Sequence, residues 1–159
     1  MSKIFLGGPI SNAMHDKDFD EKTNVTNKVF DEKIEKEIID VYGKLKSEGY
    51  EVLSAHISEN FGRNPIEVEK MFVVDTSWIY KAENAVFVLY YNKKEDCLLR
   101  TDGSYIEMGI CYERNIPITI VSNAPEEKLP TMLRSMIHNS ERVKFITIDE
   151  FLNDKVLGI

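Results

Sequence analysis

The chain has 159 residues and a formal net charge of −7, with 43% hydrophobic and 30% charged residues. These proportions are ordinary for a globular protein, and the length predicts one domain over residues 1–159. The acidic balance argues against binding to nucleic acid polymers, and no apolar run has the length of a membrane span.

No signal peptide precedes the first apolar stretch, so we expect a cytoplasmic protein that makes no membrane contact. The two cysteines, Cys97 and Cys111, lack the spacing of metal ligands, and we expect both to be free thiols. Only three histidines are present, which argues against a zinc site. We therefore expect neither a metal nor a cofactor.

Residues 3–6 form a short apolar run that predicts a strand. The loop that follows contains Gly7, Gly8, Pro9 and Ile10. Its two glycines allow a ligand to approach the backbone closely, whereas the alternative is a simple turn from strand to helix. The pattern is not that of a phosphate-binding glycine loop.

Residues 13–27 are polar, acidic and aperiodic, which favours a mobile flap over a site. A metal-binding loop is the alternative, but the calcium-loop spacing and its central glycine are missing. A helix is expected next, and Gly49 would follow its end. Its apolar face comprises Ile34, Ile38, Val41, Tyr42 and Leu45.

Residues 50–54 predict the second strand, and the segment 55–62 would reach the same end of the sheet. His56 in this segment can bond a ligand or carry a proton near neutral pH. The alternative is a half-buried histidine that is bonded to a backbone carbonyl.

Residues 65–80 predict a helix with six residues on or beside one face. These residues are Val68, Met71, Phe72, Asp75, Trp78 and Ile79. A carboxylate within an apolar stripe is unusual and makes Asp75 a candidate site residue. Trp78 is either an aromatic platform or part of the core, and the core is the default.

Two apolar runs, residues 83–90 and 116–121, predict buried strands on either side of a helix. We expect Asp102 or Ser104 to cap this helix and Asn115 to end it. Glu107 would lie in the first turn, beyond the carboxyl end of a strand, where ligands bind in open α/β sheets. The alternative is a carboxylate that only complements the helix dipole.

Residues 128–139 predict a helix, and its methionines Met132 and Met136 indicate either a subunit interface or ordinary core packing. A fifth strand over residues 143–147 and a short helix from Asp149 or Glu150 would complete the chain. We therefore predict a flavodoxin-like or Rossmann-like α/β domain. Its mostly parallel sheet would have about five strands flanked by helices.

In their order and spacing, four segments resemble the nucleoside 2-deoxyribosyltransferase family. This family includes related N-glycosidases that act on nucleoside 5'-monophosphates. The segments are Gly7 to Ile10, Ser54 to His56, Asp75 with Trp78, and Gly103 to Gly109 with Glu107.

The resemblance implies that Glu107 is a nucleophile, which attacks the anomeric carbon of a (deoxy)ribose and forms a glycosyl-enzyme ester. Asp75 would be the second acid, which protonates or holds the leaving base. A second base resolves the ester in a transferase, and water resolves it in a hydrolase; the residues leave both open.

The resemblance also implies substrate-binding residues, a small-molecule nucleoside or nucleotide and a free nucleobase as partners, and a homodimer or higher homo-oligomer. The implied binding residues are Gly7, Gly8, Pro9, Ile10, His56, Trp78, Asp102, Gly103 and Ser104. The chain departs from the phosphate-binding branch at Ser11 and Pro130, where that branch has a basic residue and a serine.

Two further functions are compatible with the same residues, because a fold and a pocket do not guarantee chemistry. One is a nucleotide-binding module without activity. The other is a flavodoxin-like regulatory or flavin-binding domain in which the acidic residues are structural.

Overall fold

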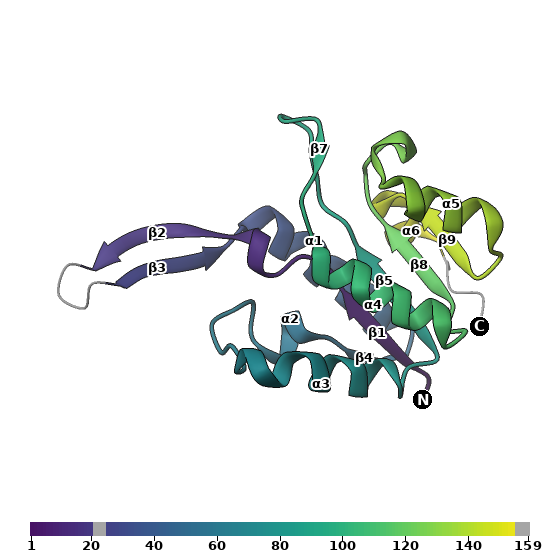
Figure 1. Cartoon of the computed structure of the whole chain (residues 1–159), viewed down its shortest axis with the longest axis horizontal. Helices are drawn as coiled ribbons and strands as arrows, with labels where there is room; N and C mark the ends of the chain where they lie inside the picture. The colour runs from purple at the N-terminus through teal and green to yellow at the C-terminus, as the bar shows by residue number, and fades with distance from the viewer. Residues whose placement is uncertain (21–24, 155–159) are drawn as a thin grey trace.

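The computed structural model describes residues 1–20 and 25–154, and its centre is a five-stranded parallel sheet (Figure 1). The strands lie in the order β4-β1-β5-β8-β9. Their bounds are β1 Lys3–Gly7, β4 Glu51–Leu53, β5 Asn84–Val88, β8 Ile118–Val121 and β9 Val143–Ile146. The five predicted strands are therefore confirmed, with ends that differ by at most two residues.

Numbered along the chain, the five strands have the spatial order 2-1-3-4-5, which is that of flavodoxin-like folds. β1 lies between β4 and β5, with Leu6 opposite Val86. The order therefore reverses at β1 and β5. A crevice forms at the carboxyl ends of strands where the order reverses, and the fold predicts a ligand site there.

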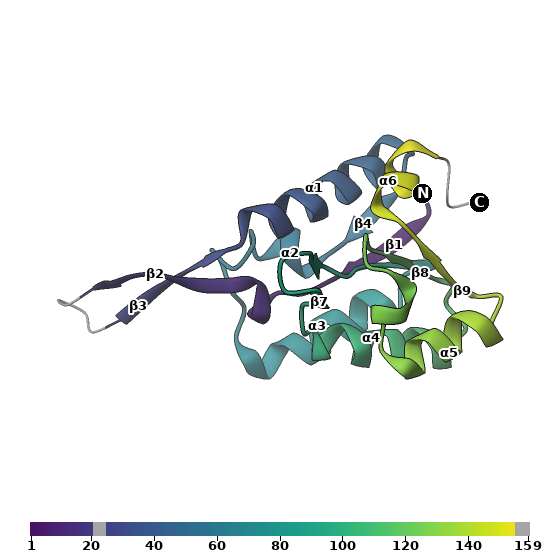
Figure 2. The ribbon, with the colours of Figure 1, turned by 90° about the horizontal axis from the view of Figure 1, so that it is seen from above.

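Helices cover both faces of the sheet (Figure 2). α1 (Glu32–Ser47) and α6 (Ile148–Asn153) lie on one face, and α3 (Val68–Ile79), α4 (Asp102–Glu113) and α5 (Thr131–Asn139) lie on the other. Each face has its own apolar core. The predicted face of α1 is confirmed, because four of its residues are buried and the fifth packs beside them. The buried four are Ile34, Ile38, Val41 and Leu45, and Tyr42 is partly buried.

The predicted apolar face of α3 is wrong over its first half. Val68 is 76% exposed and Phe72 is 64% exposed, whereas Thr76 and Ile79 are buried. The helix thus packs on the core only through its second half. The periodicity located the apolar side chains correctly, but only the neighbouring elements determine how far along a helix they are covered.

Residues 13–27 do not form an irregular flap. β2 (Met14–Asp20) and β3 (Val25–Phe30) pair antiparallel, and this hairpin projects from the body of the molecule (Figures 1 and 2). Residues 21–24, which belong to the same predicted segment, lie outside the described residues. Main-chain bonds between strands need no apolar alternation, which explains why the periodicity did not reveal the hairpin. At its base, the Asp31 amide donates to the Ala13 carbonyl at 2.8 Å.

The ends of α4 differ in part from the prediction. Its N-cap is Thr101, whose hydroxyl bonds to that of Ser104 at 2.6 Å, so neither Asp102 nor Ser104 is the cap. Asn115 follows the helix with φ +60°, as expected for a residue that ends it. The segment before α4 also contains a small hairpin, β6 (Tyr91–Asn92) and β7 (Cys97–Leu98).

The remaining elements are short. α2 (Ala55–Ser58) follows β4, and the 3-10 turns η1 (Ser11–Ala13) and η2 (Glu126–Lys128) follow β1 and β8. On α5, Met132 is exposed, but Met136 packs on the core. Both cysteines are free thiols. Within the described parts of the chain, no helix is both long enough and apolar enough to cross a membrane.

Candidate active site

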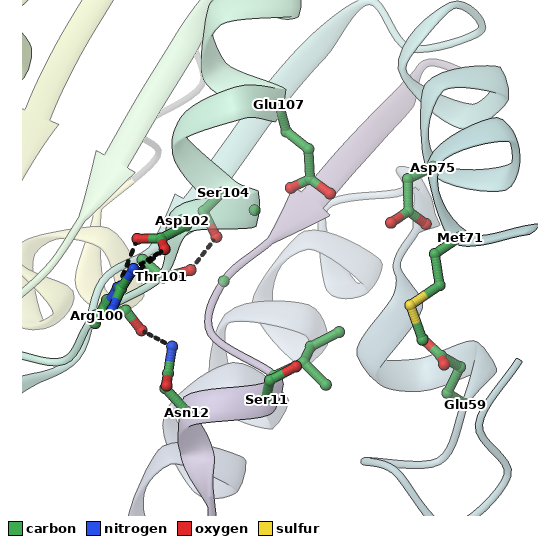
Figure 3. Close-up of a pocket in the computed structure, with 13 residues that line it drawn as sticks. Ser11, Asn12, Glu59, Met71, Asp75, Arg100, Thr101, Asp102, Ser104 and Glu107 are labelled. Carbon is green, nitrogen blue, oxygen red and sulfur yellow. Dashed lines mark hydrogen bonds and ion pairs between the residues drawn. The ribbon is translucent and has the colours of Figure 1, made fainter. Parts of the chain in front are cut away.

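A cavity of about 340 Å³ opens at the carboxyl ends of β1 and β5, where the strand order reverses. Its walls come from the loop after β1, the segment after α2, the helix α3 and the start of α4 (Figure 3). The lining residues are Gly8, Ile10, Ser11, Asn12, Glu59, Met71, Asp75, Arg100, Thr101, Asp102, Gly103, Ser104 and Glu107.

Glu107 lies in the second turn of α4, because the helix begins at Asp102 rather than later. Its carboxyl group points into the cavity toward that of Asp75 on α3 (Figure 3). A Cβ atom on Gly7 would be 3.2 Å from Glu107 Oε2 and 2.6 Å from Phe87 Cε1. The absence of a side chain at Gly7 therefore allows the Glu107 carboxyl to lie against the end of β1.

Burial has a strong effect on both acids. Burial and, to a smaller extent, the charge of Asp75 raise the pKa of Glu107 to about 8. Burial also raises the pKa of Asp75, a hydrogen-bonding interaction with Glu107 opposes the rise, and the charge of Glu59 adds to it. The pair therefore holds one proton near neutral pH.

Asp75 also presents an unsatisfied oxygen. Its Oδ1 atom is buried and has no hydrogen-bond partner among the residues that the structure describes. Such an oxygen is costly in a folded protein unless it has a partner, and it lies at the wall of a cavity. This arrangement is typical of a group that bonds a ligand.

His56 lies behind the loop that follows β1, and it does not line the cavity. Its Nε2–H donates to the Pro9 carbonyl at 3.0 Å, and only 2% of the residue is exposed. Burial lowers its pKa to about 4, so near pH 7 the ring is neutral and does not take up a second proton. The sequence left open a histidine that bonds a backbone carbonyl, and the structure shows this arrangement. His56 therefore supports the loop after β1.

The structure brings seven of the eleven candidate residues together around the cavity. These are Gly8, Ile10, Asp75, Asp102, Gly103, Ser104 and Glu107. The other four are Gly7, Pro9, His56 and Trp78, which lie outside the lining. Trp78 packs on the core shared by α3, α4 and α5, which is the alternative that the sequence favoured.

Six lining residues were not among the candidates, namely Ser11, Asn12, Glu59, Met71, Arg100 and Thr101. Met71 precedes Asp75 by one helical turn, so helical spacing could have identified it. Arg100 and Thr101 directly precede α4, and their position in the loop before the helix could have identified them. Asn12 Nδ2 donates to the Arg100 carbonyl at 2.9 Å and so joins the two loops across the crevice.

Arg100 and Asp102 form an ion pair at the rim (Figure 3). Arg100 Nε lies 3.0 and 2.9 Å from the two carboxylate oxygens, and Nη2 lies 2.6 Å from Oδ2. The pairing lowers the pKa of Asp102 and raises that of Arg100. Both side chains are therefore fully charged at neutral pH. Over the described residues, no group of three or more His, Cys, Asp or Glu is arranged to hold a metal ion.

The solved structures that share the overall fold include two that cover nearly the whole chain. One is the 2-deoxyribosyltransferase of the psychrotolerant bacterium Bacillus psychrosaccharolyticus, with a TM-score of 0.57 and 16% identity over 98% of this chain and 93% of that one. This chain has the fold of that 2-deoxyribosyltransferase. At 16% identity, the similarity between the two structures is a similarity of fold. It agrees with the resemblance found in the sequence.

The second structure is a conserved protein from Enterococcus faecalis V583. Its TM-score is 0.52, with 10% identity over 96% of this chain and 95% of that chain. No family model and no curated protein matches the sequence.

Proposed function

We propose that this protein cleaves the N-glycosidic bond of nucleosides or their 5'-monophosphates, with Glu107 as nucleophile and Asp75 as acid. The observation that carries the proposal is the pair of facing carboxyl groups in one cavity, Asp75 and Glu107, which holds one proton near neutral pH. Likeness in fold to a 2-deoxyribosyltransferase supports the same chemistry. The volume of the cavity, about 340 Å³, is within the range of small-ligand sites.

In the first half of the proposed reaction, the Glu107 carboxylate attacks the anomeric carbon and forms an ester bond to it. The bond between that carbon and the base nitrogen breaks, and its electron pair goes to the base, which takes the proton of Asp75. The raised pKa of Glu107 favours the proton on Glu107 in the resting pair, so the reaction begins when this proton moves to Asp75.

In the second half, a free base or a water molecule attacks the same carbon, and the ester bond breaks. The Asp75 carboxylate accepts the proton that the attacking group loses, and Glu107 leaves as a carboxylate. The starting state of both acids is restored. The two displacements retain the configuration at the anomeric carbon, which nuclear magnetic resonance of the product can check.

The test is base release, followed by chromatography, from a panel of nucleosides and their 5'-monophosphates. Each reaction is run with and without a second free base, using the wild type, Glu107→Ala and Glu113→Ala. Glu113 lies exposed on the same helix and outside the cavity, so its substitution is a matched control.

We expect release by the wild type and by Glu113→Ala, and none by Glu107→Ala. A new nucleoside that carries the added base would identify a transferase, and release without exchange would identify a hydrolase. Release by Glu107→Ala would refute the proposal. Ligand-dependent stabilisation without release by any variant would indicate a nucleotide-binding module.

We also propose that the protein forms a homo-oligomer. Three large apolar side chains, Val68, Phe72 and Val73, are exposed on the first half of α3. Ile106 and Tyr112 are exposed on α4, which packs beside α3. Exposed apolar groups of this size favour burial against another chain.

A further inference from the structure

The charges around the cavity are unbalanced. Among the lining residues that the structure describes, the acidic ones are Glu59, Asp75, Asp102 and Glu107, and the one basic residue is Arg100. Asp75 and Glu107 belong to the proposed chemistry, whereas Arg100 and Asp102 lie at the rim. An anionic substrate group therefore meets repulsion unless Arg100 is available to bind it.

Arg100 is already occupied. Asp102 accepts hydrogen bonds from both its Nε and its Nη2, in the two-point geometry that a phosphate would otherwise use. The bonds measure 2.6 to 3.0 Å, which is the normal range for charged partners. A phosphate could use this Nε and Nη2 edge only by displacing the carboxylate of Asp102, and on the Nη1 side it would meet a guanidinium whose charge that carboxylate already balances.

The charge of Asp102 also lies at the N-terminus of α4. Asp102, Gly103 and Ser104 are the first residues of this helix and line the cavity, and a helix N-terminus attracts anions. The negative charge of Asp102 in the first turn complements the helix dipole. A single side chain thus neutralises both features that would draw a phosphate to this rim.

We infer that the site selects the uncharged sugar end of a nucleoside over a 5'-monophosphate, and that Asp102 is the residue that sets this preference. The inference rests on the proposed function and specifies its substrate class. Ser11, which also lines the cavity, is uncharged and adds no positive charge that would attract a phosphate. Removal of the carboxylate from Asp102 would free Arg100 and leave its guanidinium beside the helix N-terminus.

The test compares kcat/KM for one nucleoside and its 5'-monophosphate in four proteins. These are the wild type, Asp102→Asn, the double variant Asp102→Asn with Arg100→Gln, and the control Asp96→Asn. Asp96 is also an exposed aspartate paired with a cation, Lys128, but it lies outside the cavity lining. Its substitution therefore changes the net charge equally without freeing a cation at the rim.

We expect the wild type to prefer the nucleoside by about tenfold or more at low salt, and added salt to reduce this preference. In Asp102→Asn, the ratio of monophosphate to nucleoside should rise about tenfold. In the double variant this gain should disappear, because the gain requires the guanidinium of Arg100. Asp96→Asn should keep the wild-type ratio.

Calorimetric titration of both ligands into Glu107→Gln measures the same preference without turnover. A wild-type preference for the monophosphate, or an unchanged ratio in Asp102→Asn, would overturn the inference, while base release would still support the proposed function. If neither ligand is bound or cleaved, both proposals fail.

Discussion

Asp75 on α3 and Glu107 on α4 point toward one another across the cavity, and burial raises the pKa of both carboxyl groups. α3 precedes β5 in the chain and α4 follows it, and both helices cover the same face of the sheet. The two carboxyl groups meet because these helices pack side by side on that face, and each helix carries its acid near the ends of β1 and β5. Their shared proton is the basis of two predictions.

The first prediction concerns stability and pH. The pKa of Glu107 is about 8 in the folded protein against 4.5 for the free side chain. Between these values the folded state binds more protons than the unfolded state, so this group lowers the free energy of unfolding as pH rises from about 4.5 to 8. Glu107→Gln removes the effect, and its stability relative to the wild type should rise across this window by about 4 kcal/mol.

Urea unfolding at several pH values from 5 to 8 measures this difference. Glu113→Gln on the same helix is the control and should show a difference from the wild type that does not vary with pH. The titration of His56 cancels, because the residue is present in every protein compared. A constant difference for Glu107→Gln across the window would contradict the raised pKa.

The second prediction concerns the acid. Asp75→Asn keeps the shape of the side chain but has no proton to give, and kcat should fall about 100-fold or more with ordinary purine nucleosides. An N7-methylated purine nucleoside carries a positive charge on its base, which leaves without protonation. The loss of kcat should therefore be much smaller with this substrate, as measured by base release. Equal losses with both substrates would assign Asp75 a role other than acid.

The third prediction tests the close contact at the end of β1. A Cβ on Gly7 would be 2.6 Å from Phe87 Cε1 and 2.7 Å from Cδ1, and the ring is buried. Gly7→Ala should therefore lower the free energy of unfolding by about 2 kcal/mol. It should also impair catalysis, because the new methyl group would crowd Glu107 Oε2.

Gly43→Ala provides the matched comparison. Gly43 lies exposed in the middle of α1, and a Cβ there would meet no atom within 4 Å. This variant should be more stable than the wild type by about 0.5 to 1 kcal/mol, because alanine is the better helix former. Urea unfolding measures both variants, and equal stability of the two would show that the contact at Gly7 is relaxed in solution.

The fourth prediction concerns assembly. If the exposed part of α3 is an interface, Phe72→Glu should place a charge in it and shift the protein toward monomers. Light scattering at micromolar concentration should report at least a dimer for the wild type. Val68→Glu, one turn earlier, should act in the same way, whereas Glu51→Gln on β4 should not. A monomeric wild type would rule out the interface.

The sequence by itself determined the elements that depend on local pattern. The spacing of Ile34, Ile38, Val41 and Leu45 identified α1 and its buried face, because helical periodicity is a property of neighbouring residues. Five apolar runs identified the five strands of the sheet for the same reason. The position of Glu107 after the third strand also placed it in the cavity, since parallel strands bring their carboxyl ends to one edge.

Only the tertiary structure decided which of the candidate side chains lie in the cavity. His56 and Trp78 occupy suitable segments, yet one supports the loop at Pro9 and the other packs on the core. The sequence pattern also did not predict that Phe72 is exposed or that Arg100 pairs with Asp102. The physical reason is that burial and electrostatic environment depend on the elements that cover a residue. Those elements come from distant parts of the chain, which local periodicity does not record.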